Sequence, residues 1–209
     1  MSEARPLVFA SADDSEELAR AEVYGLLAEL FYAPLTAELQ AQFQVAVTEA
    51  PEAGAFLEQT WGPLVAAARR LPLASVREEF DALFQGIGKP EVSLYGSFHR
   101  VGKLNERPLV EVRRDLLQLG LERVATVNET EDHLASLCEV MRFLIAGDDA
   151  GTSNLASQRR FFDAHLRGWV DAFCADVEAQ PRADFYGAAA AFARDFFAVE
   201  AQAFDLLEA

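Results

Sequence analysis

Apolar side chains recur along almost the whole chain with the 3.6-residue period of an amphipathic α-helix. The first predicted helix covers residues 11–32, where Asp13 and Glu16 have the spacing of a capping box and Pro34 follows the last periodic position. One stripe of this helix is expected to face the core, and it consists of Val23, Leu26, Leu27, Leu30 and Phe31.

Two further helices are predicted in the next forty or so residues, on the same periodicity. One begins after Thr36, and the other covers residues 56–71 with an interruption at Gly62 and Pro63, where proline removes a backbone donor. The core face of the helix after Thr36 is expected to consist of Leu39, Phe43 and Val47.

A fourth helix is predicted over residues 75–84, with Ser75 and Glu78 as its capping box. The periodic pattern then breaks over residues 86–106, which contain four glycines and a proline. An irregular stretch of this length inside a compact domain is uncommon and is often functional, so this segment is predicted to be a functional loop. The inward stripe of the fourth helix is expected to consist of Val76, Phe80, Leu83, Phe84 and Ile87.

The helical pattern resumes at Pro108 and stops at Gly120, residue types that suit the first position and the C-terminal cap of a helix. Residues 128–147 follow, and after them one long helix is predicted up to Pro181, followed by a last helix from about Phe185. The stripe of residues 128–147 is nearly ideal and consists of Leu134, Leu137, Cys138, Met141, Leu144 and Ile145.

These patterns together predict an all-α fold of eight or more helices in a single domain over residues 1–209. Residues 1–12 are predicted to form a flexible N-terminal tail. The length suits one domain, and with 51% of residues hydrophobic the chain can bury a sizeable core.

The formal net charge of −16 changes the picture of partners, because an acidic chain of this size repels phosphate backbones. Nucleic acid is therefore not expected as a partner, and a cationic or apolar partner fits better. Cys138 and Cys174 lie at apolar helical positions and do not form a disulfide framework. We find neither a signal peptide nor a segment apolar enough to span a membrane, so a cytoplasmic protein is expected, without stable membrane insertion.

The chain carries little support for a catalytic, metal or nucleotide site. Ser97, Asp132 and His133 are the residue types of a hydrolase triad, but the serine lacks the G-x-S-x-G context and neighbouring helical residues point about 100° apart. The histidines at 99, 133 and 165 lie far apart in sequence, with no second ligand at helical spacing. No phosphate-binding glycine motif is present, so no cofactor and no metal are predicted, and the chain is not expected to be an enzyme.

Asp132 and His133 stand just before the best-patterned helix, and the residues alone leave two interpretations open. In the first, Asn128 caps the helix and Glu129, Glu131 and Asp132 occupy its first turn, where acids favour the helix dipole. In the second, the pair belongs to a binding site, because a histidine in the first turn has no such explanation.

Glu129, Asp132, His133 and Leu134 resemble the E-x-x-D-H-(I/L) motif of the TorD/DmsD family of redox-enzyme maturation chaperones. Three further elements resemble this family in the same order, over residues 15 to 205: the helix segment EFDALF, the loop LYGSFH with Tyr95 and Ser97, and the segment FFDAHLRGWVDAF. The chain departs from the family pattern at Thr130, where proline is common, and at His99, where tryptophan or tyrosine is common.

The resemblance implies a cytoplasmic all-α chaperone that binds the twin-arginine signal peptide and the apo form of a molybdoenzyme catalytic subunit before export. Formate dehydrogenase is the client that the loop region favours, and the chaperone is expected as a monomer or a homodimer. The peptide-binding residues that this interpretation predicts are Phe80, Phe84, Tyr95, Ser97, Glu129, Asp132 and His133. The alternatives are a small hydrolase that uses Ser97 and His133, and a structural helical adaptor.

Overall fold

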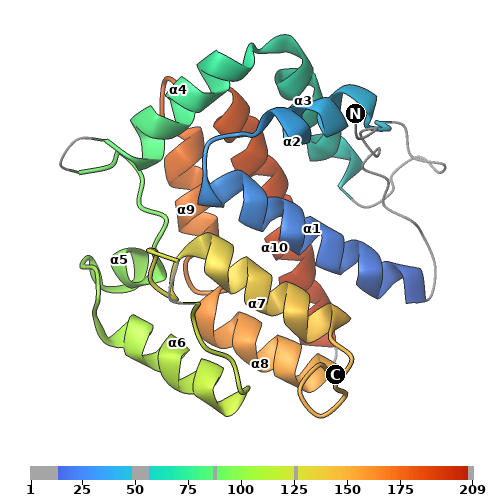
Figure 1. The fold of residues 1–209 in the computed structure, drawn as a ribbon, viewed down its shortest axis with the longest axis vertical. Coiled ribbons are helices and arrows are strands. Elements are labelled where there is room, and N and C mark those ends of the chain that lie inside the picture. Colours follow the sequence, from blue (N-terminus) through green and yellow to red (C-terminus); the bar gives the residue numbers. More distant parts are fainter. Residues whose placement is uncertain (1–13, 49–56, 87–88, 125–126, 207–209) are drawn as a thin grey trace. The chain divides into compact units, whose positions relative to one another are not determined.

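The computed structural model describes residues 14–48, 57–86, 89–124 and 127–206, and within them the chain is helical. This confirms the prediction of an all-α fold with eight or more helices, since the described residues contain ten helices and, besides one isolated β-bridge, no paired strand (Figure 1). The helices are α1 (Asp14–Tyr32), α2 (Ala37–Val45), α3 (Glu58–Arg70), α4 (Leu73–Phe84), α5 (Gly96–Val101), α6 (Arg107–Gln118), α7 (Leu134–Ala146), α8 (Leu155–His165), α9 (Val170–Glu178) and α10 (Phe185–Leu206). Among these helices, none combines the length and the apolar character needed to cross a bilayer.

The helices fall into two compact units. The first consists of Ala33–Val92 with the chain from Phe173 onward, and the second consists of α1 with Ser93–Ala172. The single domain expected over residues 1–209 stays a prediction, and the N-terminal tail expected at residues 1–12 lies outside the described residues.

In the first unit, α3 packs against α2 and α10, and α4 packs against α10. A buried carboxylate joins two of these helices, because Glu79 of α4 accepts hydrogen bonds from the backbone N–H groups of Asp184, Phe185 and Tyr186 at the start of α10. These three donors have no partner inside their own helix, so the glutamate supplies the missing acceptors. Burial raises the pKa of Glu79 while the backbone donors oppose that effect.

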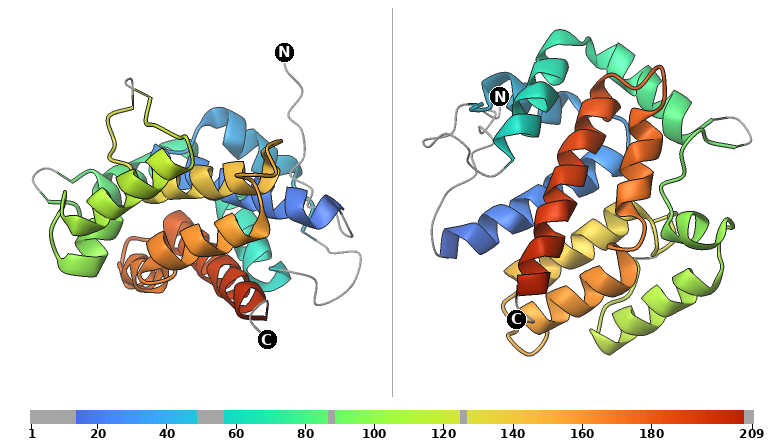
Figure 2. Two further views of the ribbon diagram at one scale, coloured as in Figure 1. Left: turned by 90° about the horizontal axis from the view of Figure 1, so that it is seen from below. Right: turned by 180° about the vertical axis from the view of Figure 1, so that it is seen from behind.

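In the second unit, α7 lies between α1 and α8, and α6 packs against both α5 and α8 (Figures 1 and 2). The stripes predicted for α1 and α7 are buried, which explains why these two long helices pair. Cys138 of α7 in this unit and Cys174 of α9 in the first unit are both buried free cysteines. The second unit carries the E-x-x-D-H residues.

Several predicted helix limits are wrong. Helix α3 continues through Pro63, its sixth residue, although the proline removes one backbone donor. The burial of the neighbouring Trp61 and Leu64 favours the helix. Helix α4 begins at Leu73 after Pro72, so Ser75 does not cap it. Val47 lies beyond the end of α2 and is 53% exposed, so it is not a core residue.

Two further predictions fail around glycine-containing segments. The stretch 86–106 is not irregular throughout, because α5 forms within it and ends at Gly102 with a positive φ of 75°. The long helix expected before Pro181 is two helices, since a turn around Gly168 separates α8 from α9. Asp13 and Ile87, predicted as a cap residue and a core residue, lie outside the described residues.

Candidate functional site

A short backbone pairing brings the loop before α5 against the residues before α7. Tyr95 and His133 form an antiparallel bridge, the N–H of Leu134 donates to the carbonyl of Leu94 at 2.8 Å, and the N–H of Gly96 donates to the carbonyl of Asp132 at 2.9 Å. Thirty-eight positions separate Tyr95 from His133 in sequence. The pairing therefore places two of the family-like motifs next to each other.

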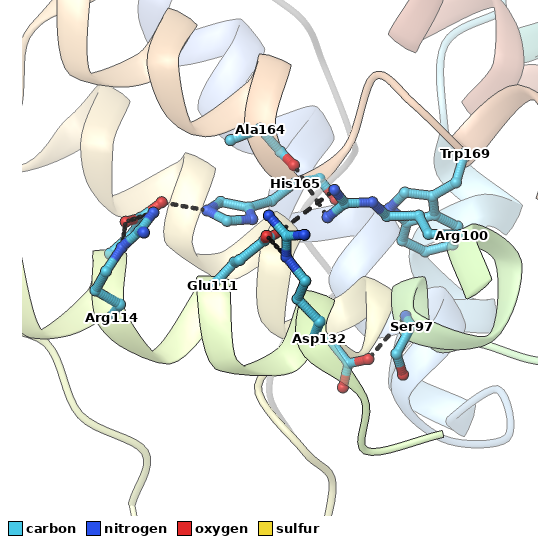
Figure 3. A network of polar contacts seen from close by, with 10 residues as sticks. Ser97, Arg100, Glu111, Arg114, Asp132, Ala164, His165 and Trp169 are labelled. Carbon is cyan, nitrogen blue, oxygen red and sulfur yellow. Dashed lines mark hydrogen bonds and ion pairs between the residues drawn. The ribbon is translucent and has the colours of Figure 1, made fainter. Parts of the chain in front are cut away.

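Asp132 is 1% exposed, and its carboxylate accepts two hydrogen bonds, of which Figure 3 shows the one from Ser97. Oδ2 accepts the backbone N–H of Ser97 at 2.9 Å, and Oδ1 accepts the hydroxyl of Thr130 at 2.6 Å. Because the Ser97 amide is in the first turn of α5, the carboxylate supplies an acceptor that this short helix lacks. Asp132 thus fastens the start of α5 to the segment before α7.

His133 is the N-cap of α7, since its Nδ1 accepts the backbone N–H of Ala135 at 3.2 Å. The prediction that Asn128 caps this helix is wrong, because the helix begins at Leu134 and Glu129, Glu131 and Asp132 precede it. An Nδ1 that accepts a hydrogen bond leaves the proton of the neutral ring on Nε2. Burial lowers the pKa of His133 to about 4, although Glu129 and Asp132 act in the opposite direction.

Two tyrosine rings contact the edge or face of the His133 ring. Tyr95 lies with its ring centroid 5.0 Å away and Tyr32 of α1 at 6.3 Å, both in edge-to-face geometry. The hydroxyl of Tyr95 donates to the Glu129 carboxylate. Burial, followed by this carboxylate, raises the pKa of Tyr95, so the phenol remains a hydrogen-bond donor at neutral pH.

The turn between α8 and α9 supports α5 from another side. The ring of His99 stacks on Trp169 at a centroid distance of 5.2 Å, and the backbone of Gly96 approaches the indole so closely that an added Cβ would lie 3.1 Å from Nε1. The indole itself is fixed, because its Nε1 donates to the carbonyl of His165 at 2.6 Å. Nε2 of His165 in turn lies 2.8 Å from Oδ2 of Asp115 in α6. The segment that resembles the family's H-L-x-x-W helix therefore positions α5.

Ser97 is fully buried, and among the described residues its hydroxyl has no hydrogen-bond partner. A hydrolase would need this hydroxyl bonded to a basic histidine nitrogen. No hydrogen bond joins Ser97 Oγ to His133 within the described residues, and the Nδ1 of His133 already accepts a backbone proton. The arrangement therefore lacks the geometry of a nucleophile and its base.

The predicted site residues separate into two groups. Tyr95, Ser97, Glu129, Asp132 and His133 lie together in the second unit, as the preceding contacts show. In contrast, Phe80 and Phe84 lie in an aromatic cluster of the first unit, where both contact Tyr186 and Phe84 also contacts Phe173. Both phenylalanines are buried, and their role as peptide contacts stays a prediction.

A groove that the sequence did not indicate runs beside the E-x-x-D-H residues in the second unit. It has a volume of about 670 Å³ and lies along α1 and α7, with residues 121–124 and Val127 as a further wall. Tyr32 and Phe143 are large apolar residues that lie outside the buried stripes of α1 and α7. Their positions were the feature of the sequence that could have indicated this groove. The apolar side chains that line it include Tyr32, Leu121, Val124, Val127, Val140 and Phe143.

Comparison of the chain with known proteins identifies a family to which it is similar. Residues 50–175 match the family described as nitrate reductase delta subunit. The chain belongs to this family. The family is the TorD group of redox-enzyme maturation chaperones, so the membership predicted from the motifs is confirmed.

Two relatives are similar to this chain over different lengths. A perchlorate reductase assembly chaperone protein from Dechloromonas aromatica (strain RCB) is 30% identical over 131 residues, which are 57% of this chain and 58% of that protein. Chaperone protein TorD from Vibrio cholerae serotype O1 (strain ATCC 39315 / El Tor Inaba N16961) is 28% identical over 204 residues, which are 90% of this chain and 93% of that protein. The chain spans a little over half the length of the first relative and nearly all of the second.

Proposed function

We propose that this chain is a chaperone for the assembly of a molybdoenzyme and that it does not itself catalyse a reaction. The observation that carries the proposal is its membership of the family, together with relatives named as assembly chaperones. The arrangement around Ser97 and His133 agrees with it, because these residues form hydrogen bonds that hold helices together and lack a nucleophile–base pair.

The proposed client is the catalytic subunit, bound in its apo form and through its twin-arginine signal peptide before export from the cytoplasm. Such a peptide has a basic segment followed by an apolar one, and the formal charge of −16 favours the approach of a basic ligand. Formate dehydrogenase is the candidate enzyme, on the resemblance of the loop region. In this proposal Tyr95, Ser97, Glu129, Asp132 and His133 form or support the peptide site.

Affinity purification of the tagged full-length chain from its own cells, followed by mass spectrometry, tests this function. The expected result is enrichment of one molybdoenzyme catalytic subunit that still carries its signal peptide and lacks its cofactor. Recovery of only the mature, cofactor-loaded subunit, or of no molybdoenzyme subunit, would contradict the proposal.

A fluorophosphonate probe, which modifies activated serines, tests the hydrolase alternative. We expect no labelling of Ser97, because its hydroxyl has no basic partner among the described residues. Labelling that disappears in a Ser97→Ala variant would favour the hydrolase instead.

A further inference from the structure

We propose that the groove along α1 and α7 is the surface that holds the apolar part of the client peptide, and that the E-x-x-D-H residues position the groove without touching the peptide. The inference rests on the proposed function for the kind of ligand, a peptide with an apolar run next to basic residues. Its location rests on the exposure, charge and hydrogen bonding of the second unit alone.

Exposed apolar side chains make this groove a surface that suits an apolar partner. Val124 is 64% exposed and Phe143 is 39% exposed, and both line the groove, as does the partly exposed ring of Tyr32. Large apolar residues that gather in a concave surface are typical of ligand and peptide sites. The volume of about 670 Å³ suits several aliphatic side chains.

The formal charge of the groove indicates which residues of the peptide lie next to its apolar run. Four acids line it, Glu29, Glu122, Glu131 and Glu139, against the two bases Arg123 and Arg142, so the formal charge of the lining is −2. Each base pairs with an acid of the groove, Arg123 with Glu131 and Arg142 with Glu139, and Arg123 also donates to the carbonyl of Val127. The remaining formal charge of −2 therefore comes from Glu29 and Glu122. An apolar peptide with basic residues at its end complements this lining, whereas an acidic peptide does not.

The motif residues are placed to support the groove and not to line it. Asp132 and His133 are buried, and their polar groups already bond to Ser97, Thr130 and the backbone of Ala135. Two residues of the groove contact His133: the ring of Tyr32 packs against the His133 ring, and the backbone N–H of Ala135 donates to Nδ1 of that ring. Glu131, which stands at an x position of the motif, lines the groove itself and pairs with Arg113 of α6.

Fluorescence titration of the full-length chain with a defined labelled peptide tests the location. The probe carries two arginines followed by a run of leucine and alanine. Val124→Asp and Phe143→Asp are expected to weaken binding at least tenfold, because each places a carboxylate against the apolar run. The matched controls are Val110→Asp, at a residue 62% exposed on α6, and Leu155→Asp, at a residue 41% exposed on α8. Both lie outside the groove and are expected to bind like the unmodified chain.

A pair of His133 variants separates positioning from direct contact. Asparagine offers a side-chain oxygen to the N–H of Ala135, so His133→Asn is expected to retain binding, whereas His133→Leu, which cannot accept that hydrogen bond, is expected to lose it. Loss of binding in both variants, with the fold intact by circular dichroism, would make the imidazole a contact residue and overturn this part of the inference.

The outcomes distinguish the groove from the proposed function. Equal binding by the groove variants and the controls would overturn the inference while leaving a chaperone role intact. Groove-dependent binding of the probe without capture of any molybdoenzyme subunit would support the inference and remove the proposed client. Equal affinity for a probe in which glutamates replace the arginines would overturn the charge argument, and concentration-dependent dimerisation abolished by Val124→Asp would show that a second copy occupies the groove instead.

Discussion

Asp132 is the residue for which burial changes the expectation most. An acid in an exposed first turn of a helix contributes only about 0.3–1 kcal/mol through the helix dipole. In the structure this carboxylate is instead buried and accepts the N–H of Ser97 and the hydroxyl of Thr130. A buried donor that loses its acceptor costs more than a lost dipole contact.

We therefore predict that Asp132→Ala lowers the free energy of unfolding by about 1–3 kcal/mol, because it leaves the Ser97 amide without its acceptor. Urea denaturation followed by circular dichroism measures this change. Glu22→Ala, at an exposed position of α1, serves as the control and should remain within about 0.5 kcal/mol of the unmodified chain. Equal midpoints for the two variants would show that the carboxylate has no structural role.

The neutral His133 ring makes stability depend on pH. Its folded pKa of about 4 lies below the unfolded value near 6.5, so between these values the unfolded chain binds more protons than the folded one. The contribution of His133 is therefore fully present above about pH 6.5 and is lost as pH falls towards 4. The total loss is on the order of 3 kcal/mol.

The predicted test is a comparison of unfolding free energies for the unmodified chain and His133→Asn from pH 7 to pH 4. The asparagine keeps an acceptor for the Ala135 N–H and does not titrate. As the pH falls, the free energy of unfolding of the unmodified chain should decrease relative to that of His133→Asn. Parallel curves would mean that the ring is protonated without penalty in the folded state.

At the scale of elements, the short helix α5 depends on its contacts more than on its sequence. Six residues are too few for a helix to be stable alone in water. The Asp132 carboxylate holds its first turn, and the indole of Trp169 lies against Gly96 and His99. These contacts explain why α5 forms inside a stretch whose glycines and proline predict a loop.

Gly96→Ala is predicted to destabilise the chain by about 1–3 kcal/mol, because the new methyl group would lie 3.1 Å from an indole that is itself hydrogen-bonded. Gly62→Ala in α3 is the matched control, since an added Cβ there meets no atom within 4 Å. That control should instead stabilise the chain by up to about 1 kcal/mol, as alanine favours a helix. Thermal unfolding of the two variants should therefore move in opposite directions, and a shared direction would rule out the close packing at Gly96.

Some elements follow directly from periodicity and others do not. The stripes of α1 and α7 repeat over several turns, and the sequence predicts both their existence and their buried residues. In contrast, the first residues of α4 and α7 do not follow from the polar residues that the sequence offers as caps. Pro72 precedes α4 and His133 caps α7, although the sequence offers Ser75 and Asn128 as better cap residues.

At the scale of the whole molecule, the formal charge of −16 is the property that acts on a partner over the longest distance. This charge attracts a basic peptide from a distance, and dissolved salt screens the attraction. The apolar groove, in contrast, contributes to binding only when the peptide is in contact with it. The two contributions respond differently to ionic strength, so they can be separated in one experiment.

We predict that the affinity for the arginine-containing probe falls by about tenfold between low and high salt and then levels off. Titration calorimetry over a series of sodium chloride concentrations measures this dependence. The probe without arginines provides the control and should bind more weakly at low salt but with little salt dependence. Complete loss of binding at moderate salt would remove the apolar contribution, and complete insensitivity would remove the charge contribution.

The sequence by itself determined the all-α fold, most of the buried stripes and the family to which the chain belongs, because helical periodicity and short motifs are properties of neighbouring residues. Only the tertiary structure decided that Tyr95 pairs with His133, that Asp132 is buried against Ser97, and that Phe80 lies in another compact unit. The groove beside Tyr32 and the residues that line it also come from the structure alone. Such arrangements join segments that are dozens of residues apart, and their position depends on how loops close and which buried polar groups find partners.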